Sequence, residues 1–259
     1  MKNKFRIFFI FLLFTTGLRA QEDVYQTEEI AITRLVDGVL MIPPTKEPIP
    51  MVIIIAGSGP TDRDGNQPMM TNNSLKLLAE GLYQKNIASF RFDKRIIKEI
   101  RNRTVNEEQI RFEHFIDDAV SILKHFEDDS RFSKIYILGH SEGSLIGMVA
   151  AREGADGFIS IAGAGQEIDD VVVDQLAVQA PNLTESARAA FDDLRATGRA
   201  TDFNPFLGSI FRKEIQPYML SWMNYNPAEE IKKLEIPVLI INGDKDLQVQ
   251  VSEAEILKA

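Results

Sequence analysis

The 259-residue sequence contains no cysteine. Disulfide bonds are therefore excluded, and so are a thiol nucleophile and thiolate ligation of a metal. A stable fold must rely on its hydrophobic core, and a chain of this length with 44% hydrophobic residues can build one substantial core. We expect a single domain, and the sequence indicates no cofactor and no metal site.

Clustered positive charge is also missing. The formal net charge is −9, and no stripe of lysine and arginine interrupts the acidic balance. A protein that binds phosphate backbones needs such a cluster, so the sequence argues against a nucleic-acid partner. Its acidity mainly favours solubility.

The N-terminus has the features of a secretory signal peptide. Lys2, Lys4 and Arg6 precede an apolar run over residues 7–14, which is followed by small residues and Ala20. The run is short for a membrane span, and no cysteine follows it to carry a lipid anchor. We expect residues 1–20 to be removed and residues 21–259 to be secreted or periplasmic, with no stable membrane span; the alternative is a retained N-terminal anchor.

Continuous apolar runs alternate with helical patterns along the rest of the chain. The runs predict strands over residues 51–56, 87–92, 135–138, 157–162 and 237–241, after an antiparallel start over residues 30–42. Helices are predicted after Ser74 and over residues 112–126, where apolar side chains recur at helical spacing. This alternation predicts an α/β fold, with a mostly parallel sheet flanked by helices.

Residues 166–226 have helical patterns but no comparable strand. A simple crossover between parallel strands needs far fewer residues, so we interpret this segment as a helical cap insertion over the ends of the strands, where ligands bind. The alternative is a long crossover without contact to a substrate.

Gly139, His140, Ser141, Glu142 and Gly143 form the pattern G-x-S-x-G between a predicted strand and a predicted helix. A sharp turn from strand to helix strains the backbone of the central serine and exposes its hydroxyl, and glycines on either side leave room for the turn. The pattern predicts Ser141 as a nucleophile. The alternative is a glycine-rich turn with an incidental serine.

With two further motifs, this segment resembles the α/β-hydrolase family over most of the chain after residue 20. The loop AGSG (56–59) follows the strand where the family often has an H-G-x-G-like loop, and LIINGDKDLQV (239–249) resembles its acid loop. The resemblance implies that the backbone N–H groups of Ser58 and Glu142 form an oxyanion hole, with no required role for the Glu142 carboxylate. It also implies Asp246 as the triad acid, with Asp244 as the alternative.

Charged residues follow two of the predicted strands. Arg63 and Asp64 lie in the loop after residues 51–56, and Asp93 follows residues 87–92. Carboxyl ends of parallel strands lie at one edge of a sheet, so these residues are expected to tie the oxyanion loop to the neighbouring strand. A solvated charged loop is the alternative.

No histidine follows Asp246. His114, His125 and His140 all precede it, whereas the family supplies the catalytic base after a final strand beyond the acid. We interpret His140 as structural and favour a sequence truncated before the catalytic histidine, with the last strand and helix of the fold missing and little ester hydrolysis by this chain. The alternative is a complete protein that has lost catalysis. An open apolar strand at residues 237–241 predicts poor solubility or self-association through that edge.

The predicted function is that of an exported serine hydrolase. Its predicted partner is a small-molecule ester or peptide substrate. A carboxylesterase acting through an acyl-enzyme on Ser141 is favoured. A serine peptidase of the same fold and a noncatalytic binding protein on a hydrolase scaffold are the alternatives.

Overall fold

A computed structural model describes residues 25–259; the predicted signal peptide, residues 1–20, lies outside the described residues. These residues contain a seven-stranded sheet with the order β1-β2-β4-β3-β5-β6-β7. The strands are β1 (Thr27–Ala31), β2 (Asp37–Met41), β3 (Ile49–Ile55), β4 (Ala88–Phe92), β5 (Phe132–His140), β6 (Gly157–Ile161) and β7 (Val238–Ile241). Five neighbouring strands pair in parallel, in the order β4-β3-β5-β6-β7. Strand β2 is antiparallel to both β1 and β4. The predicted mostly parallel sheet with an antiparallel start is confirmed.

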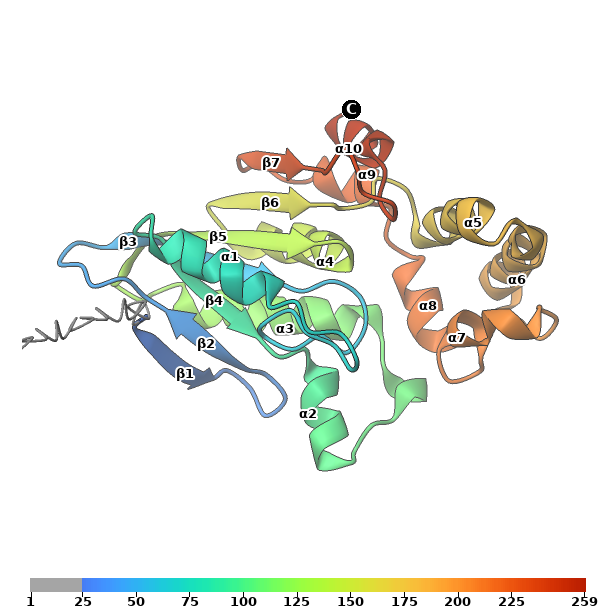
Figure 1. The fold of residues 1–259 in the computed structure, drawn as a ribbon, viewed down its shortest axis with the longest axis horizontal. Coiled ribbons are helices and arrows are strands. Elements are labelled where there is room, and N and C mark those ends of the chain that lie inside the picture. The colour runs from blue at the N-terminus through green and yellow to red at the C-terminus, as the bar shows by residue number, and fades with distance from the viewer. Residues whose placement is uncertain (1–24) are drawn as a thin grey trace, which may run out of the picture.

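Helices cover both faces of the sheet (Figure 1). They are α1 (Ser74–Tyr83), α2 (Arg95–Asn102), α3 (Phe112–Phe126), α4 (Glu142–Ala150), α5 (Ile168–Gln179), α6 (Thr184–Thr197), α7 (Gly208–Phe211), α8 (Gln216–Trp222), α9 (Pro227–Ile231) and α10 (Val251–Lys258). Short 3₁₀ helices span Glu107–Gln109, Ala151–Glu153, Pro181–Leu183 and Pro205–Leu207. Helix α1 packs on one face, and α3 and α4 pack on the other, so the central strands are covered on both sides.

The apolar runs become the centre of the molecule. Strand β4 is buried along its whole length, and Ile53, Ile54 and Ile55 of β3 are at most 2% exposed. Alternate residues of one strand point to opposite faces, so a strand covered by helices on both sides must be apolar throughout. This is the reason why the run MVIII forms a central strand.

Helices α5 to α8 lie between β6 and β7, within the segment predicted as a helical insertion. They form a separate group beyond the carboxyl ends of the parallel strands (Figure 1). Residues 25–259 contain no helix long and apolar enough to cross a membrane.

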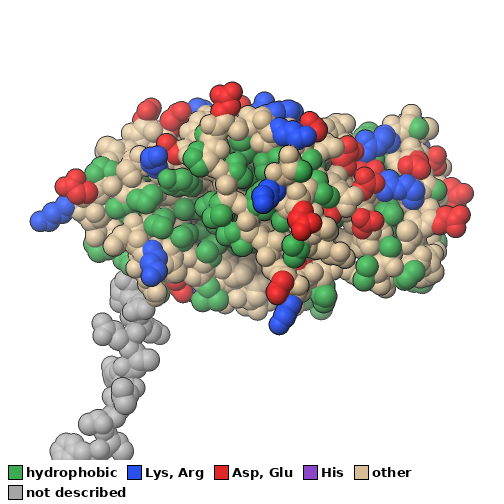
Figure 2. Space-filling model, turned by 90° about the horizontal axis from the view of Figure 1, so that it is seen from above, with side chains coloured by type: hydrophobic (Ala, Val, Ile, Leu, Met, Phe, Trp, Pro, Cys, Tyr) green, Lys and Arg blue, Asp and Glu red, His purple; other side chains and the backbone are tan. Residues whose placement is uncertain are grey.

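Strand β7 forms one edge of the described sheet. Its side chains Val238, Leu239 and Ile241 are 37%, 52% and 44% exposed, although the strand is apolar. Figure 2 shows the molecule of Figure 1 from above, which is the side on which β7 lies in Figure 1. Hydrophobic side chains gather on this face. The apolar edge expected from residues 237–241 is therefore present in the structure.

Candidate active site

Ser141 occupies a sharp turn between β5 and α4. Its backbone angles are φ 53° and ψ −120°, a combination that side-chain-bearing residues rarely adopt. Its N–H donates to the carbonyl oxygen of Ile161 at 2.9 Å, and its own carbonyl accepts from the N–H of Ser144 at 2.8 Å. The surrounding hydrogen bonds thus hold Ser141 in the strained turn that the sequence predicts.

Gly139 and Gly143 are required by close backbone contacts. A Cβ atom at Gly139 would lie 2.0 Å from the carbonyl oxygen of Gly143. One at Gly143 would lie 2.5 Å from the carbonyl oxygen of Ala56. The second contact brings the start of α4 against the loop after β3, so the glycine that permits the turn also permits the two predicted oxyanion segments to meet.

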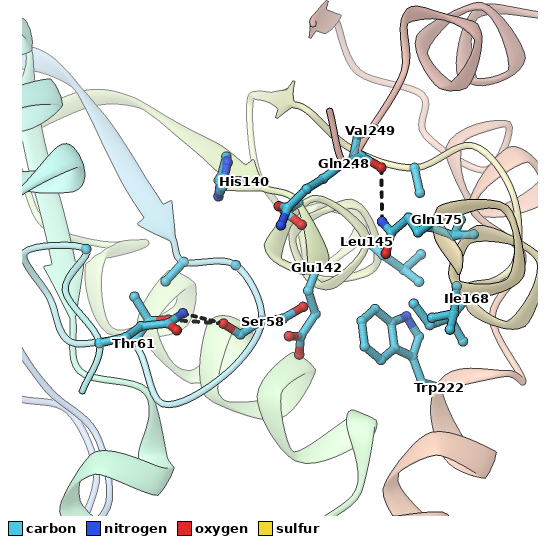
Figure 3. A pocket seen from close by; sticks show the side chains of 18 of the residues that line it. Ser58, Thr61, His140, Glu142, Leu145, Ile168, Gln175, Trp222, Gln248 and Val249 are labelled. Carbon is cyan, nitrogen blue, oxygen red and sulfur yellow. Dashed lines mark hydrogen bonds between the residues drawn. The ribbon is translucent and has the colours of Figure 1, made fainter. Parts of the chain in front are cut away.

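The loop that carries Ser58 packs beside Ser141. A Cβ atom at Gly57 would lie 3.3 Å from the Cβ atom of Ser141, and Ser58 lines the same pocket as Ser141. The Ser58 carbonyl accepts hydrogen bonds from Gln67 Nε2 at 2.7 Å and from Thr61 Oγ1 at 3.3 Å (Figure 3). Within residues 25–259 the Ser58 N–H has no hydrogen-bond acceptor.

Glu142 is the first residue of α4, so its N–H has no acceptor within the helix. The N-terminus of a helix also carries partial positive charge. The two predicted oxyanion donors, Ser58 and Glu142, therefore lie on adjoining segments around Ser141, and both line one pocket. Such an arrangement can stabilise negative charge on an oxygen bound between them.

Ion pairs tie the loop after β3 to the end of β4; because this loop carries the predicted oxyanion donor Ser58, we call it the oxyanion loop. Arg63 donates to Asp93 through its backbone N–H at 2.9 Å and through its side chain at 3.0 Å, and Arg91 pairs with Asp64 at 3.1 Å. Burial alone would raise the pKa of Asp93, but the hydrogen bonds and charge of Arg63, together with the charge of Arg101, hold that pKa below its ordinary value. The expected tie between loop and strand is confirmed.

Asp246 lies in the loop after β7. Its Oδ1 accepts from the N–H groups of Gln248 at 2.8 Å and Val249 at 3.0 Å, and both of these residues line the pocket. Within residues 25–259 its Oδ2 has no hydrogen-bond partner. Asp244 is exposed and makes no side-chain hydrogen bond to the described residues. The geometry therefore singles out Asp246 as the oriented carboxylate.

The three histidines have different surroundings. His114 Nδ1 accepts from the Arg111 N–H at the start of α3, and the His125 ring packs edge-on against Phe126. His140 lines the pocket, beside the oxyanion loop. Partial desolvation lowers the pKa of His140, while the negative charge of Asp246 opposes that shift. No histidine among residues 25–259 is hydrogen-bonded to Ser141 or Asp246.

The pocket beside Ser141 has a volume of about 510 Å³. Its apolar wall comes from α4 and the helices between β6 and β7, namely Leu145, Ile168, Val171, Val172, Met219 and Trp222. The oxyanion loop and His140 lie across from this wall, as Figure 3 shows. The helices of residues 166–226 thus line part of the pocket that contains Ser141.

The Glu142 carboxylate has surroundings that the sequence interpretation missed. Its side chain is 1% exposed and pairs with Lys94 at 3.3 Å, and it also accepts the hydroxyl of Tyr218. Burial and the charge of Glu142 raise the pKa of Tyr218 well above its ordinary value. The only sequence signal was the charged triplet Asp93, Lys94 and Arg95 directly after a buried strand.

The fold has known counterparts among solved structures. Est1E from Butyrivibrio proteoclasticus matches with a TM-score of 0.57 and 17% identity, over 89% of this chain and 83% of that chain. The α/β hydrolase GrgF from Penicillium sp. sh18 matches with a TM-score of 0.56 and 11% identity, over 91% of this chain and 85% of that chain. The chain has the α/β-hydrolase fold. The resemblance carried by the three motifs is thereby confirmed at the level of the fold.

One curated protein is similar to this chain in sequence. The chain is 29% identical over 245 residues to the esterase EstD of Thermotoga maritima, covering 90% of this chain and 55% of EstD. The chain therefore spans about half the length of this curated relative. No family model matches the chain.

Proposed function

We propose that this α/β-hydrolase chain carries the catalytic centre of a serine hydrolase that cleaves carboxylic esters through an acyl-enzyme on Ser141. One observation carries the proposal: Ser141 is held with φ 53° at the start of α4, in the wall of an open pocket. The similarity to the esterase EstD supports the same reaction class.

In the proposed reaction, Ser141 Oγ attacks the ester carbonyl carbon and loses its proton to a base. The resulting oxyanion accepts hydrogen bonds from the N–H groups of Ser58 and Glu142. The carbon–oxygen bond to the alcohol breaks, and the base returns the proton to the departing alcohol. Water then hydrolyses the acyl-enzyme by the same steps, releasing the acid and restoring Ser141.

The proposal assigns the base to an imidazole other than the three histidines of residues 25–259. His114 accepts a backbone N–H and the His125 ring packs against Phe126, and neither residue lines the pocket. His140 adjoins Ser141 in the chain without a hydrogen bond to it. An incoming imidazole could donate to Oδ2 of Asp246, because the loop amides already hold Oδ1. A histidine beyond the present sequence would fill this place.

The apolar wall favours an ester of an apolar acid. Val171, Val172 and Trp222 present hydrocarbon surface to the pocket, and the helices that carry them lie outside the core sheet. Burial of each acyl CH₂ contributes about 0.8 kcal/mol in such an environment. Ester substrates of increasing acyl length should therefore react faster until the pocket is filled, whereas peptides should be poor substrates.

Export is part of the proposal. Residues 1–20 would direct the chain out of the cytoplasm and be removed after Ala20. Expression of the full sequence in a bacterial host, followed by N-terminal sequencing of the periplasmic protein, should find Gln21 at the N-terminus. An intact Met1 on a membrane-bound product would instead support a retained anchor.

A fluorophosphonate probe tests the reaction itself, with free imidazole added as an external base. We expect slow labelling of the 259-residue chain without imidazole and faster labelling with it. Ser141→Ala should remain unlabelled in both conditions, and His140→Ala should behave like the parent. Labelling that requires His140 would overturn the assignment of the base. Absence of labelling under both conditions would favour a noncatalytic binding protein.

A further inference from the structure

Lys94 places a buried ammonium group directly behind the oxyanion loop. Its side chain is 4% exposed, and its Nζ donates to the carbonyl oxygen of Gly57 at 3.1 Å. The backbone N–H of Lys94 donates to the carbonyl oxygen of Thr61 in the same loop at 3.2 Å. The loop is therefore attached to the end of β4 at two points by this one residue.

The charge of Lys94 is balanced within the protein. Nζ lies 3.4 and 3.3 Å from the two carboxylate oxygens of Glu142, and 4.6 Å from the centre of the Phe115 ring. The Glu142 carboxylate also accepts the hydroxyl of Tyr218, from α8 in the insertion. A buried ion pair costs desolvation energy, and replacement by apolar residues is often neutral or stabilising, so stability alone is a weak reason for this one.

The contact with Gly57 has a consequence for Ser58. The Gly57 carbonyl and the Ser58 N–H belong to one planar trans peptide, because residues 25–259 contain no cis peptide bond. The two groups of such a peptide point in opposite directions. A donor that holds the oxygen therefore also holds the direction of the N–H.

The next peptide is held as well. The Ser58 carbonyl accepts from Gln67 and Thr61, so the peptides on both sides of Ser58 are fixed by side chains. Glycines flank this residue at 57 and 59, and Gly59 has φ 87°. Without these bonds, the glycine-rich backbone could rotate with little steric resistance.

We propose that Lys94 is a positioning residue, whose ammonium group turns the Gly57–Ser58 peptide so that the Ser58 N–H faces an oxyanion on the substrate of Ser141. The ammonium group is held by the Glu142 carboxylate, which in turn accepts the hydroxyl of Tyr218. This inference rests on the proposed esterase function. Glu142 then has two separate tasks: its N–H donates to the oxyanion, and its carboxylate holds the group that orients the other donor.

The test uses the double variant Lys94→Met/Glu142→Gln, because removal of both charges leaves no unpaired buried ion. Phosphonylation of Ser141 is measured with free imidazole present, and reversible probe binding is separated from the covalent step. We expect the covalent rate constant to fall about 10- to 100-fold, as for a misplaced catalytic group, with little change in reversible binding. A crystal structure of the variant should show a rotated or disordered Gly57–Ser58 peptide.

The matched control is Lys124→Met/Glu127→Gln. This pair is joined at 2.8 Å on the surface, and its side chains are 44% and 45% exposed. The same two substitutions there should leave the covalent rate constant and the loop unchanged.

Chemical rescue separates the ammonium group from general packing. The chain has no cysteine, so Lys94→Cys introduces a single thiol. Alkylation of the unfolded variant with 2-bromoethylamine, followed by refolding, restores an ammonium group at nearly the original length. It should recover most of the lost rate, whereas iodoacetamide, which leaves a neutral group, should not.

A double variant that reacts at the parental rate with an unchanged peptide, or equal recovery with both alkylating reagents, would overturn the role of Lys94. A parent that is never phosphonylated would refute the proposed function, while the orientation of the Gly57–Ser58 peptide would still test the positioning.

Discussion

The N–H of Ser141 donates to the carbonyl oxygen of Ile161 across 2.9 Å. This bond connects the predicted nucleophile to the end of the neighbouring strand β6, at the point where the backbone of Ser141 is most strained. The strain persists because the hydrogen bond and the packing of α4 restrict the alternatives.

Ser141→Gly and Ser141→Ala should differ in stability. Both remove the hydroxyl, but only glycine adopts φ 53° without a steric penalty. The glycine variant is relieved of about 1–3 kcal/mol of backbone strain, and the greater conformational entropy of glycine in the unfolded chain offsets part of this gain. We therefore expect the free energy of unfolding of the glycine variant to be about 1 kcal/mol higher than that of the alanine variant. Thermal unfolding should show a Tm about 2–4 °C higher for the glycine variant. Equal Tm values would mean that the turn stores no strain.

Gly143→Ala should displace the oxyanion loop. Its Cβ would lie 2.5 Å from the Ala56 carbonyl oxygen, and such overpacking typically costs about 1–3 kcal/mol. Urea unfolding should register the loss, and phosphonylation of Ser141 should slow.

Gly81→Ala is the control for this substitution. Gly81 is exposed in α1, and an added Cβ there would meet no atom within 4 Å among the described residues. Alanine is the better helix former, so this variant should gain up to about 1 kcal/mol. A Gly143→Ala protein as stable as Gly81→Ala would contradict the close contact.

Asp93→Asn should destabilise the protein in a pH-dependent way. The native pKa of Asp93 lies below its value in the unfolded chain, so its carboxylate stabilises the fold above the unfolded value of about 4. That contribution declines as the pH falls through the native pKa. Loss of one partner of such a buried pair costs about 3–5 kcal/mol, and asparagine should retain part of the hydrogen bonding.

Urea unfolding of parent and Asp93→Asn at several pH values measures this effect. The difference should be nearly constant from pH 7 to pH 5 and should shrink at lower pH. A difference that stayed constant down to pH 2 would assign it to packing and not to charge.

Strand β7 should mediate self-association of the 259-residue chain. Val238, Leu239 and Ile241 are exposed along an edge with unpaired backbone groups in the described sheet. Leu239→Lys should shift the chain toward monomers in sedimentation experiments, because lysine on an edge strand opposes pairing. Phe206→Lys is the control, because it replaces an 85% exposed apolar side chain that does not belong to β7. It should leave association unchanged.

Local sequence patterns were sufficient to predict the α/β layers and to nominate the candidate site residues. Central strands are continuous apolar runs because helices cover both of their faces, and this can be read without coordinates. The elbow at Ser141 is equally local, since its turn, its two glycines and its flanking elements occupy one short segment. The choice of Asp246 over Asp244 followed from the resemblance to the acid loop, and the loop amides around its Oδ1 agree with that choice.

The surroundings of Glu142 depend on contacts between distant segments. Lys94 lies 48 residues before it and Tyr218 lies 76 residues after it, yet all three side chains share one buried cluster. Helical or strand periodicity carries no information about which charges will be buried together, because that depends on how β4, α4 and α8 pack. Apolar periodicity alone therefore specified the layers of this protein, whereas the partner of each buried charge was set by the packing of segments that are remote in the chain.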